Sequence, residues 1–454
     1  MWWGLYNLAR ESDTYRPRLG EVSRGIRDNN DVPVITKDLV NGLFLSKGYM
    51  SGSVTRLERY QQCPFKFYAQ YGLKLEPRRV RSFGAPEIGT FLHANLERLG
   101  NYLLDNNKQW RDLNEEDQQN LCRSVADEIL QENQGGEETS DAYQKAIEQR
   151  VQRTLHVTVD RLVEWSKRSD FDTKYLEQDF GRQGGWDPIR VPLGEERYLR
   201  LIGQIDRIDE YTRDGQTYGM VIDYKSGGAH VTAQDVYYGL KLQLMTYLLA
   251  LESAYGKTRG ESITPAAVVY SYVKNPKIPA DVPISYEDAV SLAKESDAWK
   301  NSGYFSDDVE LLTHIDNKFL SYGLKQGPYV PIATTKDQTI SRNDLRKVKN
   351  PGEFDVMCRY TNHVMADIGR HIGDGQFPIQ PYQLHKNRSC TYCDYNTVCR
   401  FDSSRNRYNY LSKLSEADAL ERMKEALNDG NNSSDGNNSS DRNNSNEGGE
   451  NHGC

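Results

Sequence analysis

The chain has 454 residues, 37% of them hydrophobic and 27% charged, with a formal net charge of −8 at pH 7. That length allows a large core and two or three domains. No stretch approaches the ~20 consecutive apolar residues of a membrane span, and the start lacks the basic and apolar regions of an export signal. We therefore expect a cytoplasmic protein with no membrane partner. The negative charge disfavours nucleic-acid binding over the whole surface, so DNA binding would need a local basic track or a partner that supplies one.

The N-terminal part of the sequence predicts one helix. Residues 1–50 are mixed in composition and show no clear amphipathic pattern. Residues 51–75 predict a helix with Leu57, Tyr60 and Cys63 on one side. The aromatic residues in this segment are typical of core packing.

A second helix is predicted to begin at Pro86-Glu87. Its apolar residues recur at helical spacing: Ile88, Leu92, Leu96, Leu99 and Leu103. His93 lies next to this stripe, where a lone histidine is usually structural. Residues 104–168 are charged and helical in pattern, with a break at Gly135-Gly136, and we expect a surface helical insertion.

Residues 201–225 predict a β-hairpin, because alternating apolar residues flank an Asp214-Gly215 turn. Side chains alternate along a strand, so Asp223 and Lys225 share a face, and strand pairing would bring Asp206 beside Asp223. Two close carboxylates repel each other, and a hard divalent ion such as Mg²⁺ relieves that repulsion. Lys225 is then placed to orient or deprotonate a water, or to stabilise charge on a phosphate. A solvated salt bridge is the simpler alternative.

A helix is predicted over residues 236–251, with Gln243 and Tyr247 four positions apart on one face. A hydrogen-bonded pair on the helix surface is the simpler interpretation of these two residues. Gly256-Lys257-Thr258 has the ending of a phosphate-binding loop. That motif needs a glycine where this chain has Leu251, and it should follow a strand. We therefore expect no ATPase site in this chain.

The remaining segments are a strand, a helix and a polar tail. Residues 266–274 predict a buried strand and residues 351–374 a helix, whereas residues 280–345 are irregular. Residues 413–427 predict a short helix. Residues 428–454 are rich in Asn, Ser and Gly, cannot form a core, and are expected to be disordered.

Three cysteines are clustered as Cys390-x2-Cys393-x5-Cys399. This spacing in a short Tyr-rich loop indicates a metal site more than a set of buried thiols. Four thiolates would suit a tetrahedral Zn²⁺ or a [4Fe–4S] cluster, but no fourth cysteine lies nearby in the sequence. Zinc sites more often pair two short Cys-x2–4-Cys units, so one group of three is less typical of zinc.

Together these motifs resemble the RecB-like branch of the PD-(D/E)XK nucleases and, within it, the C-terminal nuclease domain of the AddB family, which forms one half of the bacterial AddAB helicase–nucleases. The hairpin and the helix after it carry a G-x-x-D, D-Y-K-S-G and Q-x-x-x-Y series. The entry segment reads S-V-T-R-L-E-x-Y-x-x-C-P-F, and the second helix reads I-G-x-x-x-H-x-x-L-E. The resemblance covers roughly residues 40–412.

The resemblance implies an α/β, restriction-endonuclease-like core with helical insertions and an iron–sulfur staple held by four cysteines. The implied ligands of Mg²⁺ or Mn²⁺ are His93, Asp206, Asp223 and the carbonyl of Tyr224. Gln243 and Tyr247 are implied to lie beside the active site and hold the nucleic-acid strand. Glu177, in an E-x-x-F-G strand, either supports the site or is an ordinary strand residue.

The resemblance also implies the fourth ligand of the cysteine site. The implied [4Fe–4S] ligands are Cys63, Cys390, Cys393 and Cys399, and this cluster is preferred over zinc. Because the cluster would tie a helix before the nuclease core to a loop after it, we expect a structural role and not electron transfer.

The implied function is metal-dependent exonuclease cleavage of DNA, with a single strand at the site, in double-strand-break resection and recombinational repair. The implied partner is an AddA-type helicase–nuclease subunit. Residues 1–50 are expected to be the remnant of an upstream helicase-like region, followed by a nuclease domain over residues 51–412. A separate chain could carry the missing region. Two alternatives remain open: a truncated, catalytically silent DNA-binding or scaffolding fragment, and a free-standing single-strand exonuclease.

Overall fold

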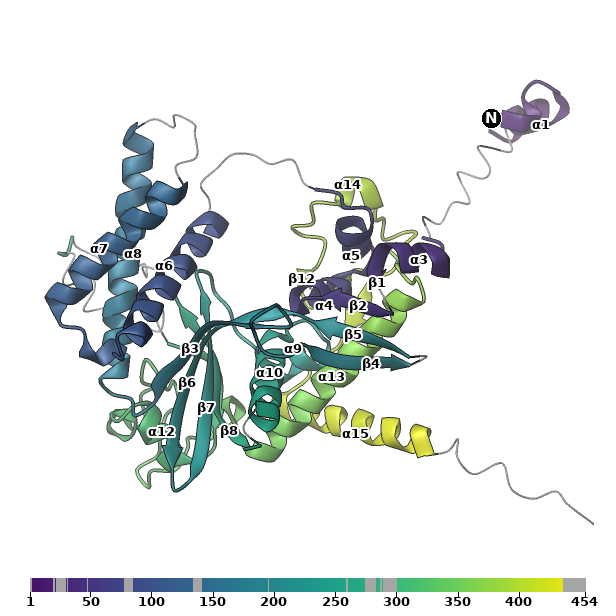
Figure 1. Ribbon diagram of the computed structural model, residues 1–454. Helices are drawn as coiled ribbons and strands as arrows, with labels where there is room; N and C mark the ends of the chain where they lie inside the picture. Colours follow the sequence, from purple (N-terminus) through teal and green to yellow (C-terminus); the bar gives the residue numbers. More distant parts are fainter. Residues whose placement is uncertain are drawn as a thin grey trace, which may run out of the picture.

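The computed structural model describes residues 2–18, 21, 30, 32–46, 48–76, 85–133, 141–194, 196–258, 260–273, 283–285, 288 and 300–435. A mixed six-stranded sheet lies at the centre, in the order β10-β9-β8-β7-β6-β3 (Figure 1). In that order its strands are Val348–Lys349, Ser302–Ser306, Ile263–Tyr272, Gln216–Lys225, Gly203–Arg213 and Asp172–Phe180. The predicted α/β class is therefore confirmed.

Two smaller sheets accompany the central one. The first has the order β1-β2-β5-β4, with strands Leu45–Ser46, Tyr49–Gly52, Arg197–Leu201 and Ile189–Gly194. The second has the order β12-β11-β13, with strands Asn387–Arg388, Tyr382–Leu384 and Asn409–Leu411. This second sheet flanks the cysteine loop.

Strands β6 and β7 form the predicted hairpin. They pair antiparallel from Arg207 opposite Ile222 to Arg213 opposite Gln216. The turn is Asp214-Gly215, with φ angles of 52° and 79°. A two-residue hairpin turn favours positive φ at both positions, and Asp followed by Gly adopts it readily.

Helices cover both faces of the central sheet (Figure 1). On one face lie α6 (Ala85–Asp105), α7 (Glu115–Asn133) and α8 (Asp141–Ser166). On the other lie α10 (Gln243–Thr258) and α13 (Pro351–Gly373). Because side chains alternate along a strand, Met220 and Ile222 of β7 pack with the first group and Val221 with the second. The strand predicted at 266–274 is β8, and the helix predicted at 351–374 is α13.

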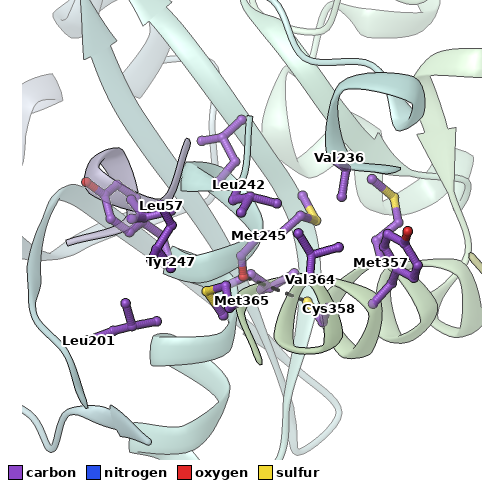
Figure 2. Packing of buried hydrophobic residues seen from close by; sticks show 14 of the residues in the cluster. Leu57, Leu201, Val236, Leu242, Met245, Tyr247, Met357, Cys358, Val364 and Met365 are labelled. Carbon is purple, nitrogen blue, oxygen red and sulfur yellow. Dashed lines mark hydrogen bonds between the residues drawn. The ribbon is translucent and has the colours of Figure 1, made fainter. Parts of the chain in front are cut away.

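The core between the sheet and α13 also receives a short helix from the N-terminal part of the chain. Figure 2 shows Tyr247 of α10, Leu242 just before that helix, Met357 and Met365 of α13 and Leu57 in the same hydrophobic cluster. Leu57 belongs to α4 (Val54–Gln62). This cluster places α4 against α10, which bears on the site below.

The region predicted as one helix over residues 51–75 is divided. After α4 come α5 (Pro64–Phe67) and a π-helical turn (Tyr68–Gly72). Cys63 interrupts the helix with φ −171° and ψ 118°. A residue before proline disfavours the helical conformation, so Pro64 explains the break.

The predicted helix over residues 236–251 is also two helices, α9 (Ala233–Tyr237) and α10. Gly239 between them has φ 68°, and a Cβ there would lie 2.9 Å from Gln61 and Val364. The apolar pattern continues across the turn, so it conceals the break. Gln243 is consequently the first residue of α10 and not an interior one.

The segment over residues 104–168 is helical as predicted, but it is more than a surface insertion. Leu162 and Trp165 of α8 are fully buried in the cluster that includes the sheet. Arg161 donates a hydrogen bond to Ser271 of β8 at 3.0 Å. The predicted break at Gly135-Gly136 lies outside the described residues.

Other differences concern the segments expected to lack structure. Within residues 1–50 the chain forms α1 (Trp2–Glu11) and α3 (Lys37–Phe44). The irregular stretch over residues 280–345 contributes β9 and α12 (Val309–Ile315).

The C-terminal helix α15 (Glu416–Asp435) continues past the expected end at residue 427, so the tail expected to be disordered begins with helix. Residues 436–454 lie outside the described part. Among the described helices, none combines the length and apolar character needed to cross a bilayer.

Candidate active site

Three carboxylates lie in one row across neighbouring strands. The β6–β7 register places Asp206 level with Asp223, and the β3–β6 register places Glu177 level with Asp206. Glu177 has φ 46°, a left-handed conformation that is uncommon for a residue with a side chain. Such outliers often occur at functional sites.

His93 reaches this row from α6. Its Nδ1 lies 3.4 Å from Asp206 Oδ2 and 3.9 Å from Glu177 Oε1. Its Nε2 lies 3.0 Å from the carbonyl oxygen of Tyr224. Because a carbonyl only accepts hydrogen bonds, Nε2 donates its proton to the Tyr224 oxygen. Nδ1 is the ring atom that faces the carboxylates, protonated in the charged ring and free to bind a metal in the neutral one. Metal-binding histidines commonly have one nitrogen fixed by a carbonyl in this way.

His93, Glu177 and Asp206 each offer one ligand atom, and these atoms lie within 4.8 Å of one another. The structure thus brings together His93 and Asp206, two of the predicted ligands, and adds Glu177. Asp223 lies outside this group, beside Asp206 and in contact with Lys225. The Tyr224 carbonyl, also predicted as a ligand, accepts the hydrogen bond from His93.

Keeping both hairpin carboxylates, Asp206 and Asp223, charged costs free energy unless a cation lies close to them. Burial raises the pKa of Asp206 to about 6, although the charge of His93 lowers it. Burial and then the charge of Asp206 raise the pKa of Asp223 to about 7. Asp223 Oδ2 is buried and forms an ion pair with Lys225. Adjacent buried carboxylates with raised pKa values fit a divalent-ion site.

A polar chain links Lys225 to α10. Lys225 Nζ donates to Gln243 Oε1 at 3.2 Å, and Gln243 Nε2 donates to the Tyr247 hydroxyl at 2.8 Å. The prediction that Gln243 and Tyr247 share a helix face is confirmed. Both side chains therefore lie beside the carboxylate row.

Glu58 of α4 lies next to this series of hydrogen-bonded side chains. Its Oε1 accepts hydrogen bonds from the backbone N–H groups of Leu242 at 2.7 Å and Gln243 at 3.2 Å. Burial raises the pKa of Glu58 to about 7. Sequence reasoning gave Glu58 no role and left Glu177 undecided, because neither the backbone twist at Glu177 nor the α4–α10 contact is visible in a periodic pattern.

The structure brings Cys63 to the cysteine loop. Four cysteines line one small cavity: Cys63, Cys390, Cys393 and Cys399. Its other walls include the aromatic rings of Phe65 and Phe401. Burial raises the pKa of Cys63 and of Cys390 to about 11, which disfavours free thiolates. Backbone N–H groups of Lys66, Gln380 and Phe65 oppose this rise in the pKa of Cys63.

The fold and the carboxylate row agree with the comparison to known families. The family model described as the PD-(D/E)XK nuclease superfamily matches residues 51–400. The chain therefore belongs to the PD-(D/E)XK nuclease superfamily.

Several curated relatives are named as the B subunit of an ATP-dependent helicase/deoxyribonuclease. The chain is 30% identical over 432 residues to the one from Clostridioides difficile (strain 630), which covers 94% of this chain and 36% of the relative. It is 30% identical over 434 residues to that of Thermoanaerobacter sp. (strain X514), with the same two coverages. It is 31% identical over 433 residues to that of Clostridium perfringens (strain SM101 / Type A), and this match covers 93% of this chain and 36% of the relative. The chain thus spans about a third of the length of these relatives.

Proposed function

We propose that this chain is a metal-dependent exonuclease that hydrolyses DNA phosphodiester bonds. The observation that carries the proposal is the row of Glu177, Asp206 and Asp223 on three adjacent strands, with His93 above it and Lys225 beside it. A single divalent ion would bind to His93, Glu177 and Asp206, with Asp223 adjoining. Carboxylate oxygens suit Mg²⁺, and the imidazole nitrogen also suits Mn²⁺.

A divalent ion held there would stabilise negative charge that develops on the scissile phosphate. The chain's own groups do the rest. Lys225 places an ammonium next to Asp223, where it orients the attacking water or stabilises the phosphate oxygens. Gln243 holds that ammonium by its Oε1, and Tyr247 fixes the amide in turn.

A groove beyond the strand ends supports binding of a DNA strand. Tyr272, which pairs with Lys225 across β7 and β8, lines the groove. Its basic lining residues are His230, Lys300, Arg346, Lys347, Lys349, His385, Lys386 and Lys413. Acidic residues also line it: Asp235, Asp307, Glu353 and Glu416. Lys347 and Lys349 are held in ion pairs with Asp344 and Glu416, so the lining carries only a small excess of positive charge in a chain with a net charge of −8.

For the cysteine site we propose a [4Fe–4S] cluster that acts as a structural staple. The four cysteines line one small cavity, as a cluster with four thiolate ligands requires. One group of three cysteines with a distant fourth is less typical of zinc, whose sites more often pair two short Cys-x2–4-Cys units.

The setting we propose is resection of DNA double-strand breaks for recombinational repair, together with an AddA-type helicase–nuclease subunit. The supporting observation is the printed name of the relatives, which describes the B subunit of a helicase/deoxyribonuclease.

The test is cleavage of end-labelled single-stranded DNA with Mg²⁺ by the wild type, Asp223→Ala and the control Asp187→Ala. Asp187 is an exposed carboxylate paired with Lys257 at 3.2 Å, away from the carboxylate row. We expect cleavage by the wild type and the control, and its loss in Asp223→Ala. Equal products from all three would favour the catalytically silent scaffold. Activity without co-purification of an AddA-type chain would favour a free-standing exonuclease.

A further inference from the structure

Helix α10 begins without a cap of its own. The first N–H groups of any α-helix lack partners within the helix. The residue before α10 is Leu242, whose apolar side chain cannot accept a hydrogen bond. Glu58 of α4 supplies the acceptor instead, because its Oε1 receives the N–H groups of Leu242 and Gln243. A carboxylate at this end also interacts favourably with the helix dipole.

A second contact fixes the same turn. Gln61 lies three residues after Glu58, so both side chains project from one side of α4. A Cβ at Gly239 would approach Gln61 Cγ to 2.9 Å, which shows how closely α4 packs on the α9–α10 turn. Leu57 and Tyr247 lie in the same hydrophobic cluster (Figure 2). The start of α10 is therefore positioned by α4.

This position matters because Gln243 is the first residue of α10. Its side chain holds Lys225 and Tyr247 at once, at 3.2 and 2.8 Å. A shift of the first turn would move Gln243 Oε1 away from the Lys225 ammonium. The far end of α4 leads directly into Cys63, so the cysteine site anchors the same helix.

We propose that Glu58 is a positioning residue for the nuclease centre: by capping α10 it fixes Gln243, and through Gln243 it holds Lys225 against Asp223. The inference rests on the proposed nuclease function. It assigns no contact between Glu58 and substrate or metal. What Glu58 contributes is an acceptor oxygen at the correct reach, and its negative charge is secondary.

Three substitutions of Glu58 separate the contribution of its side-chain length from that of its charge. Glu58→Gln keeps an acceptor oxygen at the same distance and removes the charge. Glu58→Asp keeps the charge and shortens the side chain, and Glu58→Ala removes both. Glu252→Ala is the matched control. It removes a carboxylate that lies on α10 itself, and burial raises the pKa of that carboxylate to about 7 as well.

The rate of hydrogen–deuterium exchange at residues 240–247 in the full chain reports on the cap of α10 independently of activity. We expect faster exchange in Glu58→Ala and Glu58→Asp, and wild-type exchange in Glu58→Gln and Glu252→Ala. Unchanged exchange in Glu58→Ala would overturn the proposal. So would rescue by Asp but not by Gln, because the charge alone would then matter.

Steady-state cleavage of single-stranded DNA measures how the loss of the cap affects catalysis. We expect Glu58→Ala to lower kcat on the order of 10- to 100-fold with KM unchanged. In a double-mutant cycle, Glu58→Ala should have little further effect in a Gln243→Ala background. Additive losses would show that Glu58 does not act through Gln243. A wild type without metal-dependent cleavage would instead refute the proposed function, while the exchange experiment still decides the cap.

Discussion

Lowering the pH from 8 to 6 should weaken divalent-metal binding at the carboxylate row. The metal binds deprotonated carboxylates, whereas burial raises the pKa of Asp206 to about 6 and that of Asp223 to about 7. Below these values binding must displace protons, so affinity falls as the pH falls. Burial lowers the pKa of His93, but its bond to Glu177 and the charge of Asp206 outweigh burial and raise it overall. His93 therefore acts in the same direction.

The size of the effect follows from the two carboxyl pKa values. The two carboxyl groups are adjacent and titrate as a pair. With pKa values of about 6 and about 7, the pair is largely protonated at pH 6 and nearly fully ionised at pH 8. The apparent affinity should therefore be on the order of 10-fold weaker at pH 6, with about one proton released by the pair for each ion bound. Deprotonation of His93 adds to both figures.

Isothermal titration of the metal-free protein with Mn²⁺, in two buffers of different ionisation enthalpy, gives both the affinity and the proton count. Asp223→Asn is the matched variant, because it removes the group with the higher pKa and keeps its size. We expect a smaller pH dependence and fewer protons released in this variant. An affinity that is the same at pH 6 and pH 8, with no proton release, would refute the reasoning.

Three further predictions concern the other parts of the account. Lys225→Met should lower the cleavage rate on single-stranded DNA by roughly 100- to 1,000-fold, since it removes a charge aimed at the phosphate; a rate within threefold of wild type would exclude that role. Cys393→Ser should lose iron, measured by elemental analysis and visible absorbance, together with folded protein, because metal binding contributes folding free energy; a stable, soluble, iron-free variant would contradict the staple. Glu252→Gln should raise the melting temperature at pH 8 and leave it unchanged near pH 4.5, because burial raises the pKa of Glu252 to about 7 in the folded state and stability falls as the pH rises through that range; an equal shift at both pH values would count against it.

The hairpin could be predicted from the sequence because the residues that determine it lie close together in the chain. Alternating apolar residues and the Asp214-Gly215 turn determine the register, and that register places Asp206 level with Asp223. The same local rule put Lys225 beside Asp223. The pairing of Gln243 with Tyr247 was likewise fixed by helical spacing.

The features that sequence reasoning missed depend on packing between distant elements. Glu177 reaches the site through a left-handed backbone angle, which no hydrophobic pattern encodes. Glu58 caps a helix 184 residues away in the sequence. The break at Gly239 was hidden because apolar residues continue on both sides of the turn, and only the contact with Gln61 reveals why glycine is needed there.

The predicted ligands show a similar division. Local spacing predicted a metal site at Cys390, Cys393 and Cys399, but left the fourth ligand to the family resemblance. The structure brings Cys63 to the same cavity. The same resemblance suggested His93, and α6 places it against Asp206 at 3.4 Å.

Anomalous diffraction from crystals of the full chain soaked in Mn²⁺ tests the metal site most directly. We predict one strong peak coordinated by His93, Glu177 and Asp206, with Asp223 next to it, and loss of that peak in Asp206→Ala crystals. Manganese bound elsewhere while this pocket contains only solvent would contradict the proposed metal-dependent hydrolysis.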